Sequence, residues 1–234
     1  MKKKVYFIPG TMCTKRLWEQ SWELLDSRVF DEYDFIHLSI PTQGSLAEIV
    51  DELGTQLRQA PGYVLGFSLG GYIAGKLVIK FGDAITKLMI VSNSLKALPQ
   101  KEVKLRRNIL EWMENNAYQG VTTKRIMELL YSNCANKQAI VDCMKTMDKE
   151  LGEKIFKHQL SVSTARSNIL EQVCQNAIDL TFLIGKDDPL VHCGELIKAV
   201  KHFPQHKVHS VAQCGHMLPL EHPSIFAKVL STWL

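Results

Sequence analysis

The chain has 234 residues, 46% of them apolar and 22% charged, with a formal net charge of +4. These values are typical of one globular domain, and they exclude a disordered or fibrous chain. A chain of this length can bury about 70–75% of its unfolded surface, so it needs neither disulfides nor a structural metal to fold. No stretch approaches the roughly 18 uninterrupted apolar residues of a membrane-spanning helix.

The cysteines and the start of the chain indicate a compartment. The six cysteines form no Cys-x-x-Cys pair and have no metal-ligand spacing. The chain begins with Met1-Lys2-Lys3-Lys4, but the apolar run that follows ends at Pro9 after four residues, too few for the core of a signal peptide. Reduced thiols fit best, so we expect a cytoplasmic protein without a metal.

Short apolar runs alternate with helical patterns over the first 93 residues, which is typical of βα units that feed a parallel sheet. Ser45 and Glu48 can form a capping box at the start of one helix, and Gly82 can end another. The predicted strands are 5–8, 33–38, 63–67 and 85–91, and the predicted helices are 46–59 and 69 to about 81.

Residues 94–178 have a different pattern, with polar helices and no convincing strand, and we refer to them as the helical insertion. The helices predicted there are 101–115, 123–133, 137–147, 150–160 and 163–174. Strands return at 180–184 and 207–211, followed by helices 194–202 and 219–234. We therefore predict an α/β fold with a mostly parallel six-stranded sheet flanked by helices. Its core is residues 1–93 and 179–234, and the all-helical insertion precedes the last two strands.

The positive charge is concentrated in the helical insertion, which contains 13 Lys or Arg and 9 Asp or Glu, against 15 of each in the rest of the chain. Lys101, Lys104 and Arg107 recur at helical spacing and can share one face. The same block holds three more basic residues, Arg106, Lys124 and Arg125. One hypothesis is therefore a substrate that is negatively charged or attached to an acidic carrier. A net charge of +4 without an aromatic-basic stripe gives no support to nucleic-acid binding.

The segment Gly66-Phe67-Ser68-Leu69-Gly70 stands where the predicted strand 63–67 meets a helix. A Gly-x-Ser-x-Gly turn of this kind strains the backbone of its serine and presents the hydroxyl outward, and the small residues avoid a collision across the turn. The same sequence would also be found in a glycine-rich turn that only allows close helix packing, or in one that binds phosphate. The strand–Ser–helix context favours a catalytic serine.

This context resembles the α/β-hydrolase superfamily, and three further segments extend the resemblance over nearly the full length. Ile8-Pro9-Gly10-Thr11 is similar to the oxyanion loop of that family, residues 185–191 to its acid loop and residues 214–223 to its histidine loop. The resemblance implies an α/β-hydrolase fold in which the helical insertion is a cap. Two features depart from the family: its first two strands are absent, and Pro9 replaces its usual histidine.

A serine hydroxyl is a weak nucleophile, so it needs a base, and the base needs a group that fixes its tautomer. Ser68 is the predicted nucleophile. Among the eight histidines, only His216 combines a glycine neighbour, a position just after a strand and a helix that follows, so it is the predicted base. Cys13 and Cys214 lie near the site segments and could be reactive thiols, although inert packing is favoured.

Two residues compete for the role of the acid. Asp187 and Asp188 both follow the predicted strand 180–184, and the residues alone barely separate them. The family resemblance places the acid three residues after Gly185, which is Asp188. Asn93 stands where some relatives keep an alternative acid, but an amide cannot stabilise an imidazolium.

Two backbone N–H groups are expected to bind the negative charge of a tetrahedral intermediate. Leu69 N–H, at the start of its helix, is one of them. The family resemblance points to Thr11 for the other, with Met12 as its nearest competitor. Met12 and Met217 are also candidates for the acyl pocket, and ordinary apolar filling explains them equally well.

Together these residues predict a serine carboxylesterase that works through an acyl-enzyme and requires no cofactor. The small size is similar to esterases that include the pimeloyl-carrier-protein methyl ester hydrolases, which implies a small acyl ester, or a methyl ester on an acidic acyl carrier protein, as substrate. A thioesterase or a menaquinone-pathway type lyase with the same triad is an alternative. A non-catalytic small-molecule receptor or regulatory binding protein is an alternative of another class.

Overall fold

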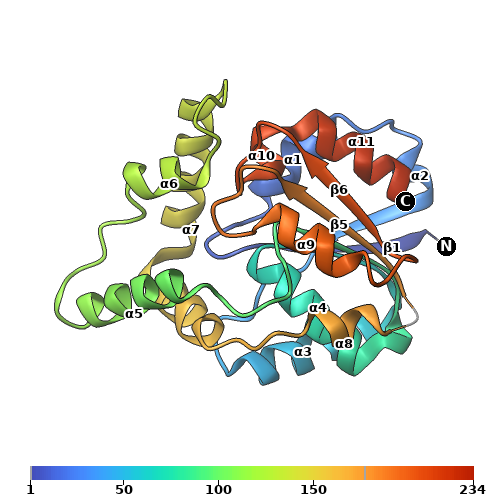
Figure 1. Ribbon diagram of the computed structural model, residues 1–234, viewed down its shortest axis with the longest axis horizontal. Coiled ribbons are helices and arrows are strands. Elements are labelled where there is room, and N and C mark those ends of the chain that lie inside the picture. Colours follow the sequence, from blue (N-terminus) through green and yellow to red (C-terminus); the bar gives the residue numbers. More distant parts are fainter. Residues whose placement is uncertain (1, 177) are drawn as a thin grey trace.

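A six-stranded parallel sheet forms the centre of the fold (Figure 1) in the order β2-β1-β3-β4-β5-β6. The computed structural model describes residues 2–176 and 178–234. All neighbouring strands are parallel, which confirms the predicted sheet. The strands are β1 (Lys3–Ile8), β2 (Tyr33–His37), β3 (Gly62–Phe67), β4 (Ile85–Val91), β5 (Asp179–Gly185) and β6 (Lys207–Val211).

Helices cover both faces of the sheet, and each face has its own apolar core. Alternate strand residues point to opposite faces, so Val64 and Leu65 of β3 belong to different cores. One core contains α3 (Leu46–Gln59), α4 (Leu69–Phe81), α8 (Leu170–Cys174) and α9 (Cys193–Val200). The other contains α1 (Arg16–Glu23), α10 (Leu218–Glu221) and α11 (Pro223–Trp233).

The helical insertion connects β4 to β5, and within its described part the regular elements are all helices. They are α5 (Gln100–Asn115), α6 (Thr123–Leu129), α7 (Lys137–Thr164) and α8. The first three lie to the left of the sheet in Figure 1, whereas α8 packs against α4. The division into a core and a cap with the predicted boundaries stays a prediction.

Several predicted helix boundaries differ from the structure. The predicted helices 137–147 and 150–160 lie in the one element α7, interrupted at Gly152, whose φ of 76° and ψ of 177° form a conformation almost restricted to glycine. The predicted helix 123–133 ends at Leu129, and only 163–164 and 170–174 of the predicted helix 163–174 are helical. Residues 219–234 form two helices because His222 leaves the helical region before Pro223.

Two helices between β1 and β2 were not predicted, α1 and the four-residue α2 (Val29–Glu32). α1 has eight residues, and no side chain caps its first turn, so it lacks the usual signal of a helix start. None of the helices in the described part of the chain combines the length and apolarity needed to cross a bilayer.

Candidate active site

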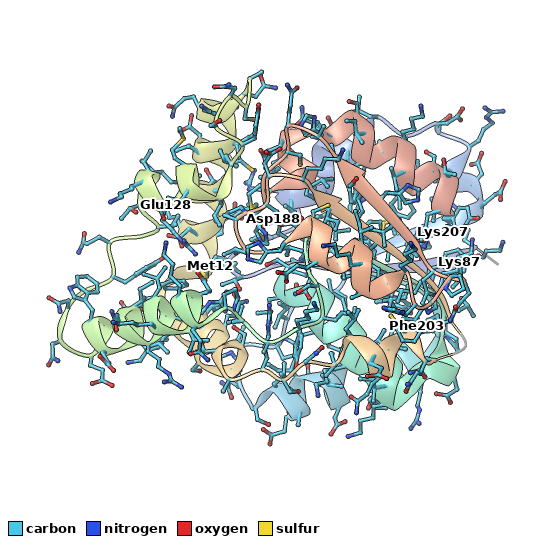
Figure 2. All side chains as sticks on the ribbon, in the orientation of Figure 1. Met12, Lys87, Glu128, Asp188, Phe203 and Lys207 are labelled. Carbon is cyan, nitrogen blue, oxygen red and sulfur yellow. The ribbon has the colours of Figure 1, made fainter. Side chains whose placement is uncertain are left out.

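The predicted site residues lie on the loops that follow β1, β3, β5 and β6. The carboxyl ends of parallel strands lie at one edge of a sheet, so these four loops are neighbours in space. The helical insertion faces the same edge, and Figure 2 shows Met12 and Asp188 between it and the sheet.

Ser68 lies in a sharp turn between β3 and α4, with a φ of 50°. This left-handed backbone is unusual for a residue with a side chain and costs energy that the surroundings must supply. The Ser68 N–H donates to Val91 O at 2.9 Å, and its carbonyl oxygen accepts from Asn93 Nδ2 at 2.7 Å. Asn93 is therefore a turn-holding residue that ties the serine to the end of β4.

The glycines on either side of Ser68 are required by close backbone approach. A Cβ at Gly66 would lie 2.3 Å from Gly70 O, and a Cβ at Gly70 would lie 2.2 Å from Ile8 O. Both distances are far shorter than a carbon–oxygen contact allows. The glycines thus let β3, α4 and the loop after β1 meet around the serine.

The structure brings Ser68, His216 and Asp188 together. His216 Nε2 lies 2.9 Å from Ser68 Oγ, and His216 Nδ1 lies 2.8 Å from Asp188 Oδ2. In the tautomer that carries its proton on Nδ1, the imidazole donates to the carboxylate and its Nε2 can accept the serine proton. The three side chains therefore have the geometry of a nucleophile, a base and an orienting acid.

The two acid candidates have different surroundings. The Asp188 side chain is fully buried, and its Oδ1 accepts the N–H groups of Leu190 at 2.8 Å and Val191 at 3.1 Å. Asp187 is exposed, and its backbone N–H donates to Cys214 O at 3.0 Å. The geometry therefore favours Asp188, which the family resemblance selected, over Asp187.

A buried carboxylate that the sequence patterns did not identify holds the loop around His216. Glu221 Oε2 accepts the N–H of Gly215 at 3.1 Å, and its Oε1 accepts the N–H of Met217 at 3.0 Å. The same Oε2 accepts Tyr131 N–H from the helical insertion at 2.8 Å. Glu221 thus binds the residues on both sides of the base, and its position in the histidine loop was the one sequence signal available.

The base loop also contacts the end of α6 directly. His216 N–H donates to Leu129 O at 2.7 Å. A Cβ at Gly215 would lie 2.5 Å from that same oxygen, so glycine is needed for the two segments to touch. The position of His216 therefore depends on the helical insertion as well as on the sheet.

Leu69 follows Ser68 in the chain, and Thr11 lines the same cavity as Ser68. Thr11 N–H and Leu69 N–H have no hydrogen-bond acceptor in the part of the chain that the structure describes. Met12 N–H instead donates to Oε1 of Gln159, a buried side chain of α7, at 2.9 Å. The arrangement favours Thr11 over Met12 as an oxyanion donor. No sequence pattern singled out Gln159, because nothing local links residues so far apart in the chain.

A cavity of about 130 Å³ is lined by Ser68 and His216 and by mainly apolar side chains, many of them from the helical insertion. Met12 and Met217, the two candidate pocket residues, both line it. Its far walls come from α5, α6 and α7 and include Leu105, Ile109, Leu129 and Leu160. The serine therefore opens into a small, mainly apolar pocket between the sheet edge and the helical insertion.

The cysteines near the site are inert by their surroundings. Burial raises the pKa of Cys13 to about 12 and raises the pKa of Cys214 still further above its ordinary value. A thiol nucleophile must be deprotonated, so neither residue has the character of a reactive cysteine. All six cysteines are unpaired, and the described residues contain no group of three His, Cys, Asp or Glu arranged to hold a metal ion.

Comparisons with known proteins agree with this fold. A sequence model of the alpha/beta hydrolase fold family matches residues 8–223. The chain belongs to that family.

The chain is 23% identical over 256 residues to the biotin biosynthesis bifunctional protein BioHC of Teredinibacter turnerae. The match covers 97% of this chain and 44% of that protein, so the chain spans less than half the length of its relative.

Among solved structures, a thermophilic esterase from Thermogutta terrifontis, with malate bound, superimposes with a TM-score of 0.84 at 17% identity, covering 100% of this chain and 89% of the esterase. A hydrolase from Pseudomonas aeruginosa gives a TM-score of 0.82 at 12% identity, covering 99% and 89%. At these identities the likeness shows the fold.

Proposed function

We propose that the protein is a serine esterase that hydrolyses carboxylic esters through an acyl-enzyme on Ser68. The observation that carries the proposal is the hydrogen-bonded series from Asp188 through His216 to Ser68 Oγ, with distances of 2.8 and 2.9 Å. Membership of a hydrolase family supports it. So does the position of the serine at the floor of an apolar cavity.

Each residue has one role in the proposed reaction. Ser68 Oγ attacks the ester carbonyl carbon while His216 Nε2 accepts its proton, and Asp188 stabilises the imidazolium that forms. The N–H groups of Thr11 and Leu69 bind the oxyanion. The bond between the acyl carbon and the alcohol oxygen then breaks, the carbonyl re-forms as the Ser68 ester, and His216 gives the proton to the leaving alkoxide. Water activated by His216 cleaves the acyl-enzyme, which yields the acid and restores the serine.

The size of the cavity favours a short acyl group. An apolar cavity of about 150 Å³ is large enough to bind benzene, and the cavity over Ser68 is about 130 Å³. An acyl chain of about five or six carbons fills that space. A thioester could react at the same triad, but no feature of the site favours it over an ester.

An ester carried by an acidic protein is the second candidate. The relative BioHC is described as a biotin biosynthesis protein, and the resemblance to pimeloyl-carrier-protein methyl ester hydrolases implies a carrier-bound methyl ester. Lys101, Lys104 and Arg107 are exposed on α5, whereas Glu102, Leu105 and Arg106 of the same helix line the cavity. The exposed basic face is therefore available to a carrier outside the pocket.

Carrier binding at this face would depend strongly on salt, because the screening length falls from roughly 30 Å at 0.01 M to about 10 Å at 0.1 M. We expect kcat/KM for a methyl ester on acyl carrier protein to fall over this range of salt. A Lys101/Lys104/Arg107 charge-reversal variant should have a lower kcat/KM for this carrier-bound ester but not for a free ester. A neutral free ester is the control. Equal salt dependence for the two substrates would argue against a carrier.

Replacing the nucleophile tests the proposed activity. The Ser68→Ala variant should keep the fold and lose up to about 10⁶-fold in turnover of short-chain acyl esters, because the residue lies on a turn and supplies the attacking oxygen. The measurement is the steady-state rate with a panel of esters at catalytic enzyme concentration. No turnover by the wild-type protein would favour the non-catalytic receptor instead, and an active alanine variant would remove Ser68 from the mechanism.

The two neighbouring aspartates provide a matched pair for the role of the acid. Asp188→Asn should lower kcat by roughly three to four orders of magnitude, because an amide favours the wrong tautomer of His216. Asp187→Asn, an identical change at an exposed position, should have little effect. Circular dichroism and thermal unfolding establish that both variants fold. A larger loss in Asp187→Asn would transfer the role to that residue.

A further inference from the structure

Two guanidinium groups of the helical insertion bind one buried carboxylate, and the charge of a third acts on them. Glu102 of α5 accepts from Arg106 Nε at 2.9 Å and from Arg125 Nη2 of α6 at 3.0 and 3.2 Å. Burial alone would raise the pKa of Glu102, but the hydrogen bond and charge of Arg106, with those of Arg125, outweigh it and lower that pKa. Glu102 is therefore ionised, and it is shared by two cations.

Arg166, just after α7, is the third member of this group, which we call the arginine cluster (Glu102, Arg106, Arg125 and Arg166). Its Nε is buried without a hydrogen-bond partner among the described residues, and its guanidinium lies 5.1 Å from the centre of the Tyr72 ring. Burial lowers the pKa of Arg166 to about 10, and the nearby charge of Arg106 acts in the same direction. The group still carries its charge at neutral pH.

The arginine cluster borders the candidate catalytic cavity. Arg106, Arg125 and Glu102 line the same cavity as Ser68 and His216. The rest of the lining is mainly apolar, and the other lining carboxylate, Asp148, accepts the hydroxyl of Tyr118 and the N–H of Val121. The lysine and arginine side chains that line this cavity, among the described residues, are therefore Arg106 and Arg125 of the helical insertion.

Several donors of the cluster are unused. Arg106 donates through Nε to Glu102 and through Nη1 to Ser163 Oγ at 2.9 Å, which leaves its Nη2 without a partner in the described chain. Arg125 Nη1 has one further contact, with the exposed Glu128 at 3.4 Å. An ionised group in a partly buried site is costly unless it is paired. One guanidinium would be enough to connect α5 and α6 through Glu102. The other guanidinium groups therefore suggest that a second anion binds here.

We propose that the arginine cluster binds an anionic group on the acyl part of the substrate, so that the preferred substrate is an ester with a second, ionised carboxylate, such as the monoester of a short dicarboxylic acid. This inference rests on the ester hydrolysis proposed above. A planar carboxylate matches the fork of guanidinium N–H donors and forms strong charge-assisted hydrogen bonds with it. The small volume of the cavity limits the chain between the two carboxyl carbons.

The experiment compares kcat/KM for monomethyl glutarate and dimethyl glutarate, which share a five-carbon acid and differ in charge. In the wild-type protein the ratio of monoester to diester should exceed tenfold. Arg125→Gln should reduce that ratio by about 10- to 100-fold, the effect of losing a hydrogen bond to a charged group. Arg28→Gln is the matched control, because Arg28 is exposed and pairs with Asp26 outside the cavity, and it should keep the ratio.

Arg166→Gln is a second variant, which removes a charge without touching the contact between α5 and α6, and it should also lower the ratio. The preference should persist at 0.5 M salt, because a partly buried contact is screened much less than an exposed one. Equal kcat/KM for the two esters, or an unchanged ratio in both Arg125→Gln and Arg166→Gln, would overturn the assignment and leave the cluster as a structural contact.

Binding of free glutarate separates this inference from the proposed function. If neither ester is hydrolysed, the esterase proposal fails. Calorimetry with glutarate then tests independently whether the arginine cluster binds a carboxylate. Binding to the wild-type protein that weakens at least tenfold in Arg125→Gln, but not in Arg28→Gln, would support an anion site. The absence of binding, or equal binding by both variants, would overturn it.

Discussion

The left-handed backbone at Ser68 is the constraint around which the site is assembled. A residue with a side chain adopts a φ of 50° only when its neighbours hold it there. The end of β4 supplies two of those contacts, through Val91 O and the amide of Asn93. Gly70 also contributes, because a residue without a side chain at this position lets α4 approach the loop after β1. One turn thus brings the serine and both candidate oxyanion donors to the same point.

The helical insertion contributes to three parts of this site. It encloses the cavity, and its Gln159 binds the N–H of Met12 in the loop after β1. It also contacts the base loop, where Leu129 O accepts His216 N–H and Tyr131 N–H donates to Glu221. A movement of α6 would therefore move the base as well as the pocket wall. The insertion is therefore part of the framework that holds the candidate site.

The sheet and the positions of Ser68 and His216 could be predicted from sequence because their signals are local. Most strands contain a short apolar run, and the serine stands in a glycine-flanked turn between a strand and a helix. Asp188 needed the family resemblance, because its neighbour Asp187 has the same side chain and only burial distinguishes them. Glu221 and Gln159 act through contacts with distant segments, which no local pattern encodes.

The orientation of α5 determines which of its basic residues are exposed and which line the cavity. The spacing of Lys101, Lys104 and Arg107 correctly placed them on one face, and that face is exposed. Arg106 and Arg125 belong to the same basic block by sequence, yet they line the cavity. Which face of α5 turns inward depends on how the insertion packs on the sheet. The sequence therefore does not show which basic residues of this block are exposed and which line the cavity.

The most direct test of the account is the identity of the atom that carries the acyl group. The protein would be mixed with a chromogenic short-chain ester, quenched in acid within milliseconds to seconds, digested and analysed by mass spectrometry. The account predicts one added acyl mass, located on Ser68, that forms and decays with the rate of product release. An acyl group on another residue such as Cys13, or turnover without any covalent adduct, would contradict it.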